Sequence, residues 1–216
     1  MKMLPLSAAA LAFCLVPVLD AGAQSRYNSQ PVGNSIRVAG TSTAHDWEMK
    51  GTLIGGHIEF GPGVTLDKSQ PAPSGLQGDK VPASAYVFIS ISTIHSEVDH
   101  LPEVMDGLMQ KAMKASDFPK IIYLLKEMTF KGPHAAGQPF KFDTSGDLSF
   151  AGRTNKVSFP ITIDPSDGKI KVSGTAPLKM TAFGVEPPAP NFGLGLMKCG
   201  DDVKILFDWT LKNKSK

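Results

Sequence analysis

The sequence has little net charge and only one long apolar run. Its 22 basic and 20 acidic residues leave a net charge of +2 over 216 residues, which argues against a nucleic-acid-binding surface. With 42% hydrophobic residues, the chain is too apolar for a disordered tail and fits one globular domain or two small ones. The apolar run lies at the extreme N-terminus, so we expect the mature protein to be soluble and to have no transmembrane segment.

That N-terminal run has the pattern of a secretory signal peptide. Lys2 precedes an apolar stretch over 4–19 that prolines interrupt, and Ala21-Gly22-Ala23 matches the small-x-small pattern that signal peptidase cleaves. A membrane anchor is the alternative, but the run is short and is broken by proline. We therefore predict a bacterial Sec-type signal peptide over residues 1–23 and a periplasmic or secreted mature protein.

Cysteine is scarce in the chain. Cys14 would leave with the signal peptide, so Cys199 is the only thiol expected in the mature protein. A single cysteine excludes an internal disulfide and a cysteine-based zinc site. We expect residues 24–34 to be a flexible N-terminal segment and residues 35–216 to form one domain that is stabilised by packing.

The mature chain shows mainly the two-residue periodicity of β-strands. Over 203–212, every second residue from Val203 to Leu211 is apolar, and residues such as Lys204 and Asp208 lie between them. Polar turns at 152–155 and 165–168 predict hairpins. In total we expect eight or nine strands, and the others lie at 36–42, 45–50, 52–60, 83–93, 120–130, 140–150, 157–163 and 170–180.

One segment, 102–115, has helical periodicity instead. Its apolar residues recur three and four positions apart, and Pro102 suits the first turn of a helix. Met105, Met109 and Met113 form a stripe along one face. Such a stripe can either adapt to an irregular ligand or pack into the core.

Two long loops, 61–82 and 183–200, are rich in glycine and proline. The first is expected to be an exposed connection. The second also contains large apolar residues, and a loop of this length inside a compact domain is usually functional. We predict that it joins the helix to form a lid or mouth made by Met105, Met109, Phe183, Phe192 and Leu196.

About eight antiparallel strands with one apolar face can close into a barrel or fold over as a sandwich. We favour a mainly β fold, an eight-stranded antiparallel up-and-down β-barrel of lipocalin-like form, with one amphipathic helix between strands. Such a barrel is either filled by side chains or just wide enough for one slim ligand. Because the inward-facing residues are apolar, the guest should be a hydrocarbon chain. The residues predicted to line the lumen are Val87, Ile89, Ile91, Phe140, Phe142, Phe150, Phe159, Ile161, Phe207 and Trp209.

The order and spacing of several segments strengthen this interpretation. They comprise 40–47 (GTSTAHDW), 114–121 (KASDFPKI), 146–160, 172–174 and 178–184. Together they span about 35–212, and over that length the sequence resembles the YceI-like family of exported bacterial polyisoprenoid-binding proteins. The resemblance implies a lipocalin-like eight-stranded barrel that holds an isoprenoid chain, such as a quinone tail. Two features depart from the family pattern: the His-Asp-Trp element at 45–47 and the length of the 183–200 loop.

Candidate chemistry is sparse. His45 and Asp46 could contribute to a metal site, but no two histidines have a spacing that places them on one face of an element, so we predict no metal ligand. On a strand these two side chains would point to opposite sides. The alternative is that they cap the first strand corner while Trp47 plugs one end of the barrel.

No catalytic motif is present. The sequence has no Gly-x-Ser-x-Gly elbow and no glycine-rich phosphate loop. Cys199 could form a thiolate beside Lys198, but no base accompanies it. We predict a non-enzymatic protein without cofactors, apart from a bound isoprenoid lipid or quinone. The alternatives are a solidly packed scaffold barrel that acts through its loops and a metal-dependent enzyme using His45 and Asp46. A homodimer remains open.

Overall fold

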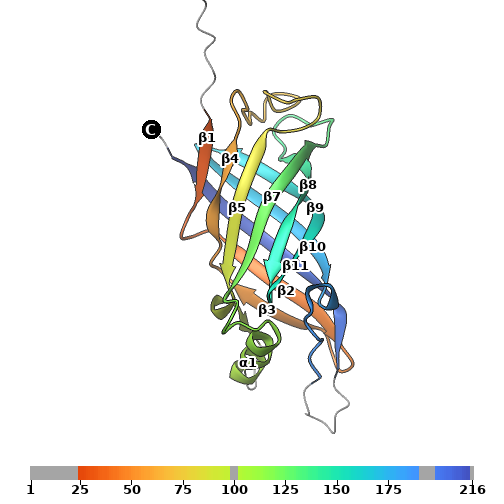
Figure 1. The fold of residues 1–216 in the computed structure, drawn as a ribbon. Helices are drawn as coiled ribbons and strands as arrows, with labels where there is room; N and C mark the ends of the chain where they lie inside the picture. The colour runs from red at the N-terminus through yellow and green to blue at the C-terminus, as the bar shows by residue number, and fades with distance from the viewer. Residues whose placement is uncertain (1–23, 98–101, 190–197, 215–216) are drawn as a thin grey trace, which may run out of the picture.

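A computed structural model describes residues 24–97, 102–189 and 198–214, and these ranges consist mainly of β-strands (Figure 1). A single α-helix, α1 (Pro102–Ala112), and two short 3-10 helices, η1 (Ile91–Thr93) and η2 (Thr181–Phe183), accompany them. The strands are β1 (Ser25–Ser29), β2 (Ser35–Ser42), β3 (Trp47–Gly51), β4 (Gly55–Phe60), β5 (Ala83–Ser90), β6 (His95–Ser96), β7 (Lys120–Phe130), β8 (Phe140–Phe150), β9 (Arg153–Ser166), β10 (Lys169–Lys179) and β11 (Cys199–Asn213).

The sheet closes on itself as a barrel of eight antiparallel strands, in the order β1-β4-β5-β7-β8-β9-β10-β11, with β11 pairing back onto β1. Near the end that carries α1, β2 takes the place of β1 beside β11, and β3 and β6 follow it. From β7 to β11, neighbours in the sheet follow one another along the chain, whereas β2 and β3 lie between the paired strands β1 and β4 in sequence. This up-and-down, lipocalin-like barrel with one short helix confirms the predicted fold.

Strand alternation decides which side chains face the interior. In β8, Phe140, Phe142, Leu148 and Phe150 are buried, whereas Lys141 between them is exposed. Because successive side chains of a strand point to opposite faces, the interior receives one apolar set from each strand. The interior is consequently almost free of charge.

Part of the segment 24–34, which we expected to be flexible, belongs to the barrel: Ser25–Ser29 form the strand β1. β1 pairs with β4 and β11, and Tyr27 packs edge-on against Phe60 with ring centroids 5.9 Å apart. The hydroxyl of Ser29 accepts a 2.9 Å hydrogen bond from the indole N–H of Trp209. The sequence of β1 shows no apolar alternation. The strand joins the ring through its backbone pairing with β4 and β11 rather than through an apolar face.

Two boundaries also differ from those predicted. The β8–β9 turn is Ala151-Gly152, with φ of 51° and 79°, rather than 152–155. A two-residue hairpin turn of this type needs positive φ at both positions, which glycine adopts freely. The helix ends at Ala112 rather than at residue 115, since Lys114 adopts a positive φ of 52° and ends the helical backbone.

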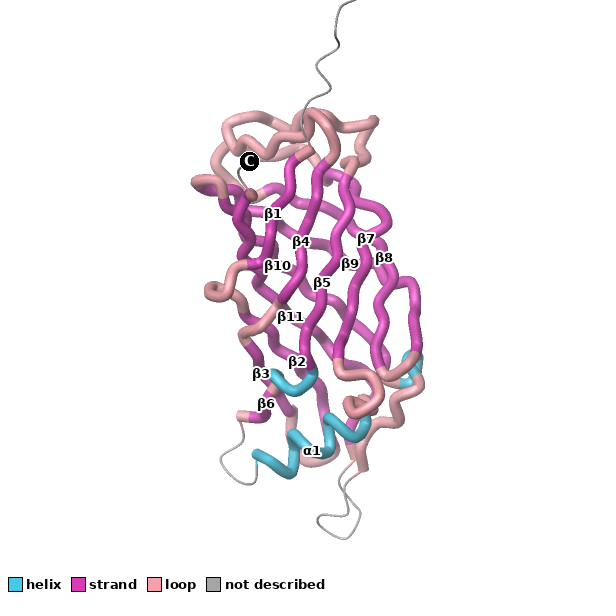
Figure 2. The backbone as a smooth tube through the Cα atoms, turned by 60° about the vertical axis from the view of Figure 1, so that its left-hand side comes forward, coloured by secondary structure: helices cyan, strands magenta, loops and turns pink. Residues whose placement is uncertain are grey.

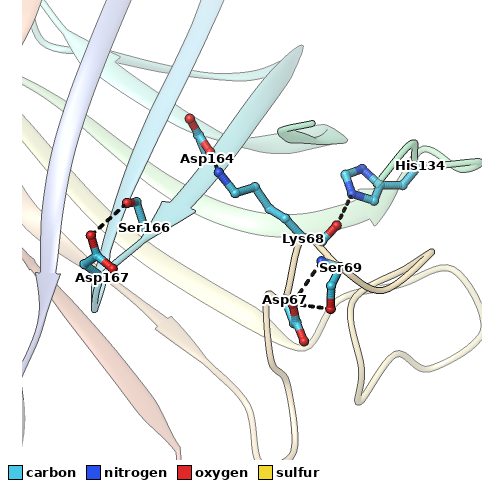
Figure 3. Close-up of polar contacts among 7 residues, drawn as sticks. All are labelled: Asp67, Lys68, Ser69, His134, Asp164, Ser166 and Asp167. Atoms are coloured by element: carbon cyan, nitrogen blue, oxygen red, sulfur yellow. Dashed lines mark hydrogen bonds and ion pairs between the residues drawn. The ribbon is translucent and has the colours of Figure 1, made fainter. Parts of the chain in front are cut away.

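The end of the barrel opposite α1 is closed. The loop over 61–82 and the β7–β8 loop lie across it (Figures 1 and 2). The ammonium of Lys68 lies 2.6 Å from the carboxylate of Asp164 on β9. The backbone carbonyl of Lys68 accepts a 3.2 Å hydrogen bond from the imidazole of His134 (Figure 3). Beneath them, the imidazole of His134 stacks on Phe140 at 4.2 Å. A closed end leaves the α1 end as the way into the interior.

Candidate ligand-binding cavity

An apolar cavity of about 570 Å³ occupies the α1 end of the barrel. We call it the outer cavity. Its helical wall includes Met105, Leu108 and Met109, and its strand wall includes Val38 on β2 and Val203 on β11. Cavities of 300–1,000 Å³ with mostly apolar walls are typical of small-molecule sites.

A second cavity of about 100 Å³, the inner cavity, lies deeper in the barrel. The two cavities share only two described wall residues, Ile121 on β7 and Ile205 on β11. Val87, Phe159 and Phe207 line the inner cavity and are only half-buried, although they point into the barrel. Their residual exposure shows that the lumen is not filled by side chains at this depth.

Aromatic rings lie against glycines on the barrel wall. A Cβ atom at Gly174 would lie 2.7 Å from Cζ of Phe207, and one at Gly146 would lie 2.7 Å from Cζ of Tyr123. At the outer cavity, the indole of Trp47 covers Gly40 in the same way, with Cζ2 at 2.4 Å. None of these three glycines has a positive φ. At Gly40 and Gly174 the missing side chain leaves room for a ring, and at Gly146 it leaves room for the Leu124 carbonyl as well as the Tyr123 ring.

The methionine stripe of α1 faces the outer cavity. Met105, Met109 and Met113 all line it, and no described residue of the helix is buried. The helix therefore covers the cavity, while Met109, Ala112 and Met113 are partly buried and also pack against the edge of the core. Asp106 attaches it to β6, because its carboxylate accepts a 2.6 Å hydrogen bond from the Ser96 backbone N–H and lies 2.7 Å from Nδ1 of His95.

Seven of the ten predicted lumen residues border one of the two cavities. Phe150 borders the outer cavity. The six that border the inner cavity are Val87, Ile89, Phe159, Ile161, Phe207 and Trp209.

The other three predicted lumen residues border neither cavity, which corrects our expectation. Phe140 and Phe142 are fully buried and pack with Phe130 at the closed end of the barrel, with centroids 6.1 and 5.9 Å from its ring. Ile91 is fully buried in η1. Alternation indicates that Phe140 and Phe142 face inward, but it carries no information on how deep along the barrel a residue lies. It does not apply to Ile91, because the strand β5 ends at Ser90.

Of the residues predicted to form a lid or mouth, Met105 and Met109 line the outer cavity. Phe183 is buried in η2 and stacks on the outer-cavity residue Phe150 with centroids 4.1 Å apart, so it supports the wall from behind. Phe192 and Leu196 lie outside the described residues.

The His-Asp-Trp element forms part of the mouth. His45 and Trp47 line the outer cavity, and the indole N–H of Trp47 donates a 3.0 Å hydrogen bond to the Thr41 carbonyl. The strand corner itself is held by Ser42, whose hydroxyl accepts hydrogen bonds from the backbone N–H groups of Ala44 and His45. Among the described residues, no three His, Cys, Asp or Glu side chains gather as metal ligands would.

Cys199 also lines the outer cavity, and burial raises the pKa of its thiol. The raised pKa disfavours the thiolate that the neighbouring Lys198 could have favoured.

Charge is confined to the rim of the outer cavity. Glu97 is the only carboxylate among the described wall residues, and no lysine or arginine is among them. Lys50, on the neighbouring β3, donates a hydrogen bond to Glu97 and lies 3.2 Å from Glu48, and these bonds raise the pKa of Lys50. The rim carboxylate is thus paired, and the cavity interior is uncharged.

Sequence reasoning missed part of the wall. Ile205 lies on the apolar face of 203–212 but was not included among the predicted lumen residues. Ile121 begins a run, 121–125, that is apolar on both faces, so alternation does not show that its side chain points inward. Gly40, Gly146 and Gly174 give no such signal, because a glycine within a strand indicates close approach of some group but not which group.

The fold and cavity define a closed β-barrel with an apolar lumen that opens under a helix. The chain belongs to the YceI-like domain family, whose model matches residues 27–211. No functionally curated protein matches it.

Two solved structures show the same fold. One, Burkholderia cenocepacia BcnA, has a TM-score of 0.58 and 15% identity, covering 82% of this chain and 95% of that one. The other is a polyisoprenoid-binding domain from Saccharophagus degradans implicated in plant cell wall breakdown, with a TM-score of 0.58 and 11% identity, covering 86% and 97%. In the described part of this chain, no helix has the length and apolarity needed to cross a bilayer.

Proposed function

We propose that this protein is a non-enzymatic lipid-binding protein that sequesters or carries a polyisoprenoid or quinone-like chain in its barrel. The observation that carries this proposal is the apolar outer cavity of about 570 Å³, which continues toward the inner cavity of about 100 Å³. Membership of the YceI-like family supports it, as does the likeness in fold to the polyisoprenoid-binding domain from Saccharophagus degradans.

The driving force is removal of the chain from water. Each buried methylene contributes about 0.8 kcal/mol, so a few isoprene units offset the cost of association and ordering. The mobile thioethers of α1 suit a methyl-branched chain, because methionine adapts to irregular shapes. The absence of lysine and arginine from the described wall favours an uncharged head group, such as a quinone, over a diphosphate.

The scaffold alternative requires a barrel that is packed solid, and both cavities oppose it. An enzymatic function finds no support in the described residues around the cavity, where the raised pKa of Cys199 disfavours a nucleophilic thiolate.

We further propose that the protein acts after export to the periplasm or beyond the cell. This proposal rests on the signal-peptide pattern of residues 1–23, which lie outside the described residues. Cell fractionation together with N-terminal sequencing of the mature protein tests it, with Gln24 expected as the first residue.

Binding is tested on two adjacent residues of β11. Ile205 lines both cavities, whereas the side chain of Leu206 faces the outer surface. Ile205→Gln places an amide in the lumen. The apparent affinity of farnesol, measured by displacement of the fluorescent probe N-phenyl-1-naphthylamine, should fall about tenfold or more. Leu206→Gln is the matched control and should bind normally. Equal affinities for both variants, or no binding of farnesol by the wild type, would contradict the proposal. Native mass spectrometry should also detect a co-purifying apolar molecule.

A further inference from the structure

The lumen narrows between its two cavities. Ile121 and Ile205 are the only described residues that border both. They come from β7 and β11, which are four strands apart in the closed ring of eight, so they project from opposite walls. A chain that fills the outer cavity must pass between these two side chains to reach the inner one.

Beyond the narrowing, the ring of Phe207 limits the free volume of the inner cavity. Phe207 projects from β11, and its ring lies on Gly174 of β10, whose missing side chain leaves room for it. Phe159 contacts the same ring at a centroid distance of 6.0 Å. The space is small: a cavity of about 150 Å³ takes a benzene-sized guest, so the inner cavity of about 100 Å³ has room for one terminal isoprene unit.

We propose that Ile121 and Ile205, with Phe207 held against Gly174, set the length of the apolar chain that the protein accepts. The outer cavity holds the main part of the chain, and the inner cavity adds one terminal unit that has passed the narrowing. Gly174 is a specificity-determining residue, since any side chain there displaces the Phe207 ring into the lumen. This inference rests on the proposed function and specifies which chains that site selects.

The test uses three isoprenoid alcohols that share a head group and differ in length. Geraniol, farnesol and geranylgeraniol, with two, three and four isoprene units, compete with N-phenyl-1-naphthylamine for the purified full-length mature protein. In Gly174→Ala, the new Cβ would lie 2.7 Å from Cζ of Phe207. We expect the affinity for the longest alcohol that the wild type accommodates to fall about tenfold, because a terminal unit loses its burial, while the affinity for geraniol stays within about twofold.

Gly107→Ala is the matched control. Gly107 lies on the outward face of α1, where an added Cβ meets no atom within 4 Å, so affinities for all three alcohols should be unchanged. Ala85→Val provides a second route to the same effect if Gly174→Ala folds poorly. Ala85 lines the inner cavity from β5, and valine is well tolerated in strands. Ala85→Val should likewise lower the affinity for the longest alcohol only.

The two tryptophans report on the two cavities separately. Trp47 lines the outer cavity and Trp209 the inner one. In Trp209→Phe, emission from Trp47 should respond to every alcohol. In Trp47→Phe, emission from Trp209 should respond to the longest alcohol but not to geraniol.

The outcomes separate the two levels of the proposal. A loss confined to the longest chain supports length selection. Equal weakening of all three alcohols by Gly174→Ala and Ala85→Val, or a Trp209 response to geraniol, overturns length selection but leaves lumen binding standing. Failure of the wild type to bind any of the alcohols overturns both.

Discussion

The phenyl rings of Phe150 and Phe183 stack with their centroids 4.1 Å apart and their planes at 21°. Phe150 ends β8 at the outer cavity, whereas Phe183 lies in η2, immediately after β10. The position of the cavity wall therefore depends on a short helix outside the barrel. Phe183 is 2% exposed, so its ring is part of the hydrophobic core.

Phe183→Ala should lower the free energy of unfolding by about 3–5 kcal/mol, because it leaves a cavity behind Phe150. Probe affinity should fall as well, since Phe150 loses its support. Denaturant unfolding measures the first effect. Phe118→Ala is the control, because Phe118 is 42% exposed, and it should cost about 1 kcal/mol or less. Similar losses in the free energy of unfolding for the two variants would show that the stack of Phe150 and Phe183 does not stabilise the fold more than an exposed ring does.

Asp106 controls how firmly α1 covers the outer cavity. Asp106→Ala removes the acceptor for the Ser96 N–H and should raise the dissociation rate of N-phenyl-1-naphthylamine about tenfold, measured by stopped-flow fluorescence. Asp106→Asn keeps an oxygen acceptor at this position and should show a smaller increase. Unchanged rates in both variants would mean that the helix does not limit release.

Cys199 should react slowly with alkylating reagents near neutral pH. Burial raises its pKa in the folded protein, so the thiol stays protonated and the nucleophilic thiolate is rare. The alkylation rate should increase with pH well above neutrality, and unfolded protein should react faster at every pH below that rise. Because Cys199 lines the outer cavity, saturating farnesol should slow the reaction further. Rapid labelling that farnesol leaves unchanged would contradict this prediction.

Asp201 should link stability to acid pH. Its carboxylate accepts hydrogen bonds of 2.8 Å from the backbone N–H and the hydroxyl of Thr181, and these bonds lower its pKa below the ordinary value of 3.8. A lowered folded pKa means that the stabilisation is present above 3.8 and is lost as the pH falls through the folded value.

Asp201→Asn should therefore reduce stability near neutral pH and flatten its decline in acid, as measured by thermal unfolding across pH. Asp202→Asn is the control: Asp202 is 81% exposed and pairs with Lys179, so its loss should have little effect. An unchanged acid profile for Asp201→Asn would refute the link.

Alternation was sufficient to predict antiparallel strands with one apolar face and most of the residues on that face, while the family resemblance favoured a barrel over a sandwich. It predicted β8 and β11 well, because one face of each strand meets the apolar core along most of its length. The same periodicity put Phe207 and Trp209 on the inward face, and both border the inner cavity.

Depth and closure could not be predicted in the same way. Phe140 and Phe207 have the same pattern in sequence, yet one packs the closed end and the other lines a cavity, because strand stagger sets their height. β1 escaped prediction because the polar segment Ser25–Ser29 is recruited by the free edges of β4 and β11 rather than by its own hydrophobicity.

The pairing of β11 with β10 on one side and with β1 and β2 on the other makes the last strand the seam of the molecule. The ring of strands is not closed until these pairings are made, so the chain without β11 in place is an open sheet. Under the proposed function, a lumen able to hold a ligand therefore exists only once the fifteen-residue strand β11 lies between β10 and β1.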